Sequence, residues 1–190
     1  KAVVAETDKR IVAVGLADGK LLWEKPYAGE GRAINTDTPL FADGVLYYSG
    51  TGRGTTACRL EKSENGITDS EVWVNPDNSV KFSTPVLKDA LFFGLSEGNQ
   101  LFCINTKDGK TVWSKEIDGR QGFGSIVTAG PVAMALTPKG ELIIFELDIA
   151  GFKQLASYKV AQNDPKAYPV VSDNRIYVKD QDALALWIVE

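Results

Sequence analysis

The sequence predicts an all-β protein of the β-propeller class, and three observations carry this prediction. One phrase occurs twice, as DGKLLW from Asp18 and as DGKTVW from Asp108. The turn glycines recur at intervals of 47, 43 and 42 residues, at Gly19, Gly66, Gly109 and Gly151. A tryptophan follows the turn in three of the units, as Trp23, Trp73 and Trp113. A repeat of about 40–50 residues that carries four short strands is typical of a propeller blade.

The third unit shows the predicted elements in order. An extended segment at 84–87 leads through a tight turn to an apolar run at 90–94, and a second run follows at 101–105. The turn at 108–109 then precedes the strand that bears Trp113. Asp-Gly between two apolar runs predicts a hairpin, because type I′ turns need positive φ at both central residues. The runs are short and rich in aromatic and β-branched residues, which favours strands over helices.

Several runs are apolar on successive residues, as at 142–145. Such strands are expected to be covered on both faces, which stacked blades provide. A two-sheet sandwich is the structural alternative, because it also has short strands with regular turns. A sandwich does not need a tryptophan at one fixed place in each unit, whereas an indole packed between neighbouring blades would recur in this way. In the fourth unit Ala156 and Tyr158 occupy this region.

The 190 residues, with 44% hydrophobic content, are enough for one domain with a substantial core. We expect a single β-propeller domain over 1–190, with a partial blade at 1–32, whole four-stranded blades at 33–80, 81–120 and 121–162, and a partial blade at 163–190. Three strands at each end cannot merge into one four-stranded blade. We therefore expect about four blades of a larger ring, its C-terminal half. The alternative is a homodimer that completes the ring, because open blade edges favour association.

Charge and hydropathy argue against two classes of partner. The net charge is −4, the isoelectric point is about 5.0, and no cluster of Lys and Arg exceeds two residues. Neither nucleic-acid binding nor attraction to an anionic membrane surface is indicated. The longest apolar stretch, 183–189, is far shorter than the roughly 20 residues that span a bilayer, so no transmembrane segment is predicted.

Two cysteines, Cys58 and Cys103, are interpreted as equivalent small residues on the third strands of successive units, with Ala13 as their counterpart in the first. A disulfide between them would need Cα atoms within about 7 Å. Packed sheets lie about 10 Å apart, so a disulfide is not expected and the cysteines do not indicate a compartment.

Two further motifs are interpreted as turns. The glycine-rich segment 50–54 lacks the Lys-Ser/Thr and the following helix of a phosphate-binding loop, and an apolar strand follows it. Asp180 and Asp182 have a spacing that suits calcium, but they fall where each unit turns from its second to its third strand. No metal site is predicted.

The repeat resembles that of the pyrroloquinoline-quinone-type propeller family, found in quinoprotein dehydrogenases and in the outer-membrane β-barrel assembly lipoprotein. The third unit carries the resemblance most fully, in STPV at 83–86, LFFG at 91–94, LFCIN at 101–105 and DGKTVW at 108–113. The resemblance covers the whole chain, with the second and fourth units degenerate, and implies a propeller fold. Because most members are extracytoplasmic, it also implies a periplasmic or secreted protein.

The enzymes of this family bind the quinone beside a calcium ion held by Glu, Asn and Asp side chains, and several have two adjacent cysteines. This chain has no adjacent cysteines and no histidine, and none of the calcium ligands can be matched. We therefore expect no catalytic residue and no cofactor. A fragment of a dehydrogenase that uses pyrroloquinoline quinone and calcium is the alternative.

Loops on a rigid scaffold are the usual place for binding residues. The segments that join one blade to the next are expected to share an end of the ring with the turns between second and third strands. A face that presents arginines beside an aromatic side chain suits a protein or peptide partner. The candidate residues on this face are Arg32, Arg53, Arg120, Gln121 and Phe123. The sequence thus predicts a non-catalytic binding scaffold, with carbohydrate binding through Phe123 as a weaker alternative.

Overall fold

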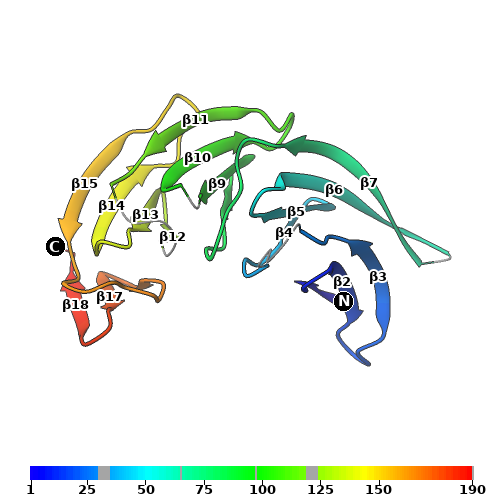
Figure 1. Ribbon diagram of the computed structural model, residues 1–190, viewed down its shortest axis with the longest axis horizontal. Coiled ribbons are helices and arrows are strands. Elements are labelled where there is room, and N and C mark those ends of the chain that lie inside the picture. Colours follow the sequence, from blue (N-terminus) through cyan, green and yellow to red (C-terminus); the bar gives the residue numbers. More distant parts are fainter. Residues whose placement is uncertain (30–34, 65, 97, 119–123, 190) are drawn as a thin grey trace.

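The computed structural model describes residues 1–29, 35–64, 66–96, 98–118 and 124–189. These residues form five antiparallel sheets that follow one another along an arc, with the two termini near its ends (Figure 1). Within the described ranges there is no helix, and hence none long and apolar enough to cross a membrane. Three four-stranded sheets are flanked by three-stranded sheets, which confirms the predicted fold class.

The strands of each sheet run in chain order from the inside of the arc to the outside. The first sheet contains β1 (Ala2–Glu6), β2 (Arg10–Gly15) and β3 (Leu21–Pro26). The second contains β4 (Leu40–Ala42), β5 (Val45–Gly50), β6 (Gly54–Ser63) and β7 (Gly66–Asn75). The third contains β8 (Val86–Lys88), β9 (Leu91–Leu95), β10 (Gln100–Asn105) and β11 (Thr111–Glu116). The fourth contains β12 (Ser125–Ala129), β13 (Val132–Leu136), β14 (Glu141–Glu146) and β15 (Gln154–Lys159), and the fifth β16 (Val170–Ser172), β17 (Arg175–Lys179) and β18 (Leu184–Ile188).

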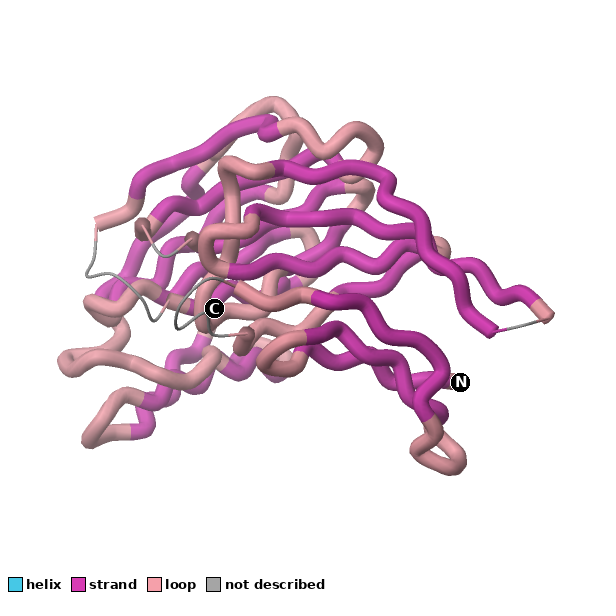
Figure 2. The backbone as a smooth tube through the Cα atoms, turned by 45° about the vertical axis from the view of Figure 1, so that its right-hand side comes forward, coloured by secondary structure: helices cyan, strands magenta, loops and turns pink. Residues whose placement is uncertain are grey.

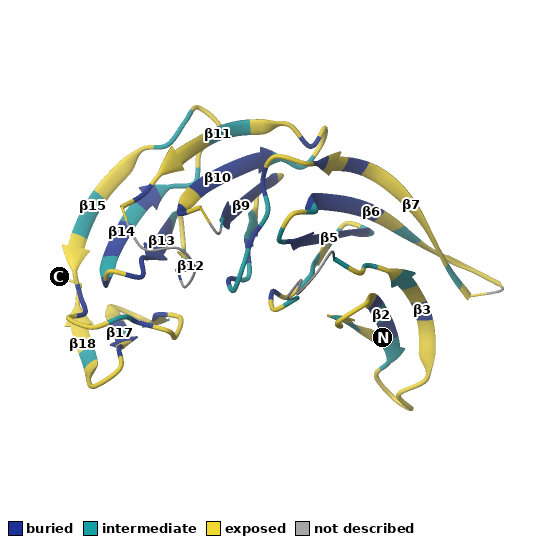
Figure 3. Ribbon diagram, in the orientation of Figure 1, coloured by how far each residue is buried: buried dark blue, intermediate teal, exposed yellow. Residues whose placement is uncertain are grey.

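The core lies between the sheets. The buried apolar residues form four clusters, one in each contact layer between successive sheets, here called a seam. On β5, Val45 and Tyr47 belong to the cluster on the third sheet, whereas Leu46 and Tyr48 belong to the cluster on the first. Runs that are apolar on successive residues are therefore buried on both faces, and Figure 3 shows this burial concentrated in the middle strands of the sheets.

A β-bulge recurs at the same place in the first four sheets. The register between the third and outermost strands shifts after Ala13, Ala57, Cys103 and Ile144. The cross-strand partners of these residues are Trp23, Trp73, Trp113 and Ala156. A large indole therefore stands opposite a small residue in three sheets, and the sizes are reversed in the fourth. The alignment of Cys58 with Cys103 was wrong by one residue, because Ala57 is the residue opposite the indole in the second sheet.

Each of the three indoles hydrogen-bonds to the next sheet. Trp73 Nε1 donates to the carbonyl oxygen of Thr106 at 2.7 Å, and Trp113 Nε1 donates to that of Asp148 at 3.1 Å. Trp23 Nε1 donates instead to the Asp69 carboxylate, at 3.0 Å. This exception arises in the second sheet, where β6 and β7 form a long hairpin that projects beyond its neighbours (Figure 2).

The Asp-Gly turn has a second role in the seam. Gly109 has φ of 72°, and a Cβ there would lie 2.6 Å from Cδ2 of the Trp73 indole. Gly19 has nearly the same conformation, with φ of 68°, but nothing within 4 Å of the Cβ position. Glycine is therefore required at 109 both by the turn and by the ring that packs on it.

We expect Gly109→Ala to destabilise the protein more than Gly19→Ala. Both changes place alanine at positive φ, which costs about 1–2 kcal/mol. Only Gly109→Ala also drives a methyl group into the indole, which adds roughly 1–3 kcal/mol. Urea unfolding of both variants measures the difference. Equal losses of unfolding free energy would show that Trp73 does not pack on this turn.

The reversed pair in the fourth sheet gives a second prediction. The seam between the fourth and fifth sheets keeps an apolar groove of about 400 Å³, lined in part by Ile144, Tyr158 and Trp187. Ala156→Trp alone is expected to overpack against Ile144 and cost about 1–3 kcal/mol. Ile144→Ala alone removes half-buried methyl groups and costs about 2 kcal/mol, the low end for Ile→Ala. The double variant should lose at least about 1 kcal/mol less unfolding free energy than the sum of the two single losses. Strictly additive losses in urea unfolding would show that a tryptophan at 156 does not fill the space left by Ile144.

Candidate interaction face

One of the five residues predicted for the loop face lies in the described part of the chain. Arg53 is in the turn between β5 and β6. The other four, Arg32, Arg120, Gln121 and Phe123, lie outside the described residues.

Arg53 is engaged within the chain. Its guanidinium lies 3.8 Å from the centre of the Tyr27 ring, and its Nη1 donates to the Tyr27 carbonyl oxygen at 2.5 Å. Its Nη2 donates to Asn35 Oδ1. Gly50 is needed beneath this contact, because a Cβ there would lie 2.8 Å from the Tyr27 hydroxyl. Arg53 thus joins the segment that follows β3 to the second sheet, and its contact with a partner stays a prediction.

Two acidic side chains near Arg53 have carboxyl oxygens that are shielded from solvent. Glu6 ends β1, and Asp37, which is 8% exposed, precedes β4. Burial raises the pKa of Glu6 to about 9; the nearby charge of Asp37 adds to this rise, while Arg53 opposes it. Burial likewise raises the pKa of Asp37 to about 7. We call Glu6, Tyr27, Asp37 and Arg53 the first-seam polar cluster.

The cluster contains several polar atoms that are shielded from solvent and unpaired. Within the described part of the chain, neither carboxyl oxygen of Glu6 has a hydrogen-bond partner. The same holds for Asp37 Oδ2, the Tyr27 hydroxyl and Arg53 Nε. Burial also raises the pKa of the Tyr27 hydroxyl. Groups of this kind cost free energy when buried, so the surrounding seam must hold them in place.

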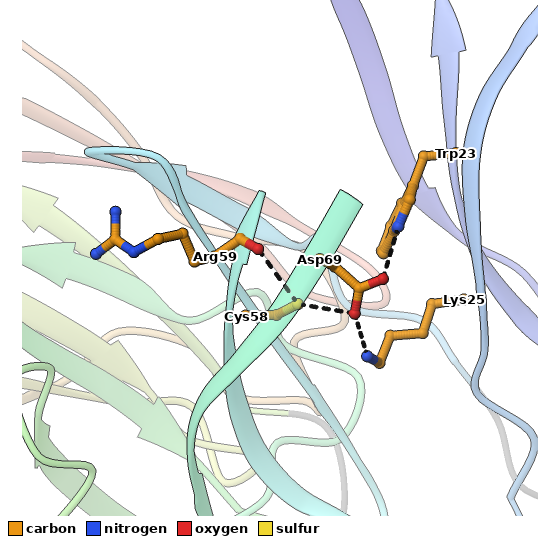
Figure 4. A network of polar contacts seen from close by, with 5 residues as sticks. All are labelled: Trp23, Lys25, Cys58, Arg59 and Asp69. Carbon is orange, nitrogen blue, oxygen red and sulfur yellow. Dashed lines mark hydrogen bonds and ion pairs between the residues drawn. The ribbon is translucent and has the colours of Figure 1, made fainter. Parts of the chain in front are cut away.

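A second polar network lies in the same seam and centres on Asp69 of β7 (Figure 4). Its carboxylate accepts from Trp23 Nε1, from Lys25 Nζ at 2.5 Å and from Cys58 Sγ at 3.5 Å. Burial alone would raise the pKa of Asp69, but the hydrogen bonds from Lys25 and Trp23 outweigh it and lower that pKa. Asp69 therefore ties the outer strand of the first sheet to the second.

The two thiols lack the features of nucleophiles. Both are free and buried. Burial raises the pKa of Cys58 to about 11, although Lys25 opposes the rise, and burial raises that of Cys103 to about 12. A reactive cysteine needs a lowered pKa, so both fit a packing role.

The segment after β7 is also used inside the protein. Asn75 Nδ2 donates to the Gly109 carbonyl oxygen at 2.8 Å and to Thr111 Oγ1 at 3.0 Å. Asn78 Nδ2 donates to the same Thr111 hydroxyl at 2.7 Å. Both asparagines are buried, so this part of the predicted loop face serves the second seam.

The acidic turn in the fifth sheet is held by backbone groups. Asp180 Oδ1 accepts from the N–H groups of Ala183 and Asp182, and its Oδ2 accepts from that of Asn163. These hydrogen bonds, with that of Ala183 the strongest, lower the pKa of Asp180. In the described ranges, no group of three or more His, Cys, Asp or Glu side chains is placed to hold a metal ion.

The glycine-rich segment forms the turn from β5 to β6. Gly54 has φ of 71°, and a Cβ there would lie 2.1 Å from the Asn75 carbonyl oxygen. A close approach between strands therefore accounts for this glycine without a bound phosphate.

Sequence reasoning missed the acidic half of the first-seam polar cluster and the role of Asp69. Glu6 follows four apolar residues at 2–5 and could have been noticed as an acid at the end of an apolar strand. Asp37 and Asp69 gave no such signal, because their partners lie far away along the chain.

The comparisons with known proteins agree on the fold. Residues 65–189 match the model of the family described as outer membrane protein assembly factor BamB. No curated protein matches the chain. The crystal structure of BamB from Moraxella catarrhalis is 15% identical with a TM-score of 0.72, and the match covers 100% of this chain and 54% of that one.

Two other crystal structures show the same arrangement of strands. Citrobacter koseri AztD is 14% identical with a TM-score of 0.61, over 98% of this chain and 56% of that one. The computationally designed protein Ika8 is 10% identical with a TM-score of 0.55, over 99% of this chain and 71% of that one. At these identities the likeness concerns the fold alone, and it confirms the predicted propeller.

The chain spans about half the length of the BamB structure. Its family match extends from the β6–β7 hairpin to the end of the fifth sheet, which is most of the chain. The resemblance predicted from the repeat is thereby confirmed, and the chain belongs to the family of outer membrane protein assembly factor BamB.

Proposed function

We propose that this chain is a non-catalytic propeller scaffold that binds a protein or peptide partner through its loop face. The family match supports this proposal, because the family is described as an assembly factor for outer membrane proteins. The same match supports a place outside the cytoplasm, in the periplasm or as a secreted protein. The partner proposed for the chain is accordingly a protein engaged in the assembly of outer membrane proteins.

The observation that carries the proposal is that the recurring tryptophans and the two cysteines serve as packing groups between the sheets. Trp23, Trp73 and Trp113 each donate a hydrogen bond to the next sheet. The thiols of Cys58 and Cys103 are buried with raised pKa values. A stack of sheets joined in this way holds its connecting loops on a rigid support, which suits partner binding. The pairing of two copies to complete a ring stays a prediction.

The test replaces two of the predicted loop-face residues, in the variant Arg120→Ala with Phe123→Ala. In the source organism we expect a several-fold loss of partner co-purification and lower amounts of folded outer membrane proteins, because an arginine and an aromatic anchor are removed together. Lys62→Ala with Val72→Ala is the matched control. It also removes one cation and one apolar side chain, from exposed positions on the β6–β7 hairpin.

Three outcomes would contradict the proposal: wild-type levels in both assays for the loop-face variant, equal losses in the control, or tight calcium-dependent binding of pyrroloquinoline quinone by the purified chain. The last result would favour the dehydrogenase fragment. Thermal unfolding of each variant shows whether a loss of function merely reflects a loss of fold.

A further inference from the structure

The first-seam polar cluster contains acceptors and donors that the seam itself leaves unused. Both carboxyl oxygens of Glu6, Oδ2 of Asp37 and the Tyr27 hydroxyl are shielded from solvent and have no hydrogen-bond partner among the described residues. Unpaired buried polar atoms are rare in folded proteins and call for a physical reason. Because these atoms are closed off from solvent, the ligand that fits among them is a proton, which needs no cavity.

The groups of the cluster come from several of the elements that meet at this seam. Glu6 is on β1, Tyr27 directly follows β3, Asp37 precedes β4, and Arg53 is in the turn between β5 and β6. Tyr48 of β5 packs edge-on against the Tyr27 ring, with ring centres 4.9 Å apart.

The segments that carry the two carboxyl groups meet at Asn35, whose Nδ2 donates to the Thr7 carbonyl oxygen at 2.6 Å and whose Oδ1 accepts from Arg53 Nη2. The charge of Asp37 raises the pKa of Glu6, and the charge of Arg53 lowers the pKa of both groups. Arg53 also faces both, and its single positive charge offsets one carboxylate but not two.

We propose that Glu6 and Asp37 bind a proton at the seam between the first and second sheets, and that loss of this proton at alkaline pH loosens the seam. With one carboxyl group protonated, one carboxylate remains to balance the guanidinium of Arg53. When the proton leaves for solvent, two carboxylates share the shielded seam with one guanidinium. Like charges without water between them repel strongly, so the first sheet and the segment around Asp37 separate from the second sheet.

The direction of the pH effect follows from the pKa values. The pKa of Glu6 is about 9 in the folded chain against 4.5 ordinarily, and that of Asp37 is about 7 against 3.8. Between these limits the folded chain holds more protons than the unfolded chain, so the free energy of unfolding falls as pH rises. The other described carboxyl groups with a shifted pKa, Asp18, Asp69 and Asp180, are shifted downward and act at acidic pH instead.

The experiment compares thermal unfolding at pH 5 and pH 9 in the wild type, in Glu6→Gln with Asp37→Asn, and in Glu116→Gln. Glu116 is exposed at the end of β11 and serves as the control. We expect the wild type and the control to lose several degrees of Tm between the two pH values. The double variant should lose less than half as much, because its amides do not titrate in this range. An unchanged pH dependence in the double variant would overturn the proposal.

A direct titration keeps the proposal testable if the double variant fails to fold. Carbon-13 labelling of the Glu and Asp side-chain carboxyl groups lets NMR follow the titration of Glu6 in the wild type. We expect its resonance to move well above pH 6, together with faster amide exchange near Tyr27 and Asp37 at pH 9 after correction for the intrinsic rate. Titration of Glu6 near pH 4.5, or exchange that does not change with pH, would refute the proposal.

Discussion

The docking of one indole onto the next sheet is the interaction on which the rest of this structure depends. A sheet with two apolar faces is stable only when both faces are covered, and here each neighbour covers one. The indole fits because it stands opposite a small residue on its own sheet. The next sheet presents an acceptor for its N–H group and, for Trp73, a glycine turn on which the ring packs. The Trp73 ring against Gly109 shows this fit most directly. The repeated sequence motif therefore reflects a contact that recurs between successive sheets.

The seams that depart from this pattern show what the indole contributes. In the first seam the acceptor is the Asp69 carboxylate, which brings Lys25 and Cys58 into the contact. In the last seam the bulge carries Ala156, and Ile144 fills only part of the space, so an apolar groove remains. Polar groups gather in the first seam, where Arg53 joins the segment after β3 to the second sheet and lies near Glu6 and Asp37. The same architecture thus combines uniform packing with seams of distinct chemistry.

The repeat allowed the fold to be predicted because turn chemistry and strand patterns are local. Asp108-Gly109 and the apolar run at 101–105 are recognisable without any partner. The site was harder to predict because its contacts are distant along the chain, as between Tyr27 and Arg53. Cys58 was misaligned because the long β6–β7 hairpin has no Asp-Gly turn near the tryptophan to fix the register. The sequence around a loop arginine is the same whether its side chain bonds within the protein or binds a partner.

Hydrogen exchange of the indole N–H groups, followed by NMR, tests the central claim most directly. Trp23, Trp73 and Trp113 each donate across a seam, whereas Trp187 is 41% exposed. We expect the first three indoles to exchange at least about 100-fold more slowly than that of Trp187, because they exchange only when a seam opens. Equally fast exchange of all four indoles would contradict an architecture held together by these contacts.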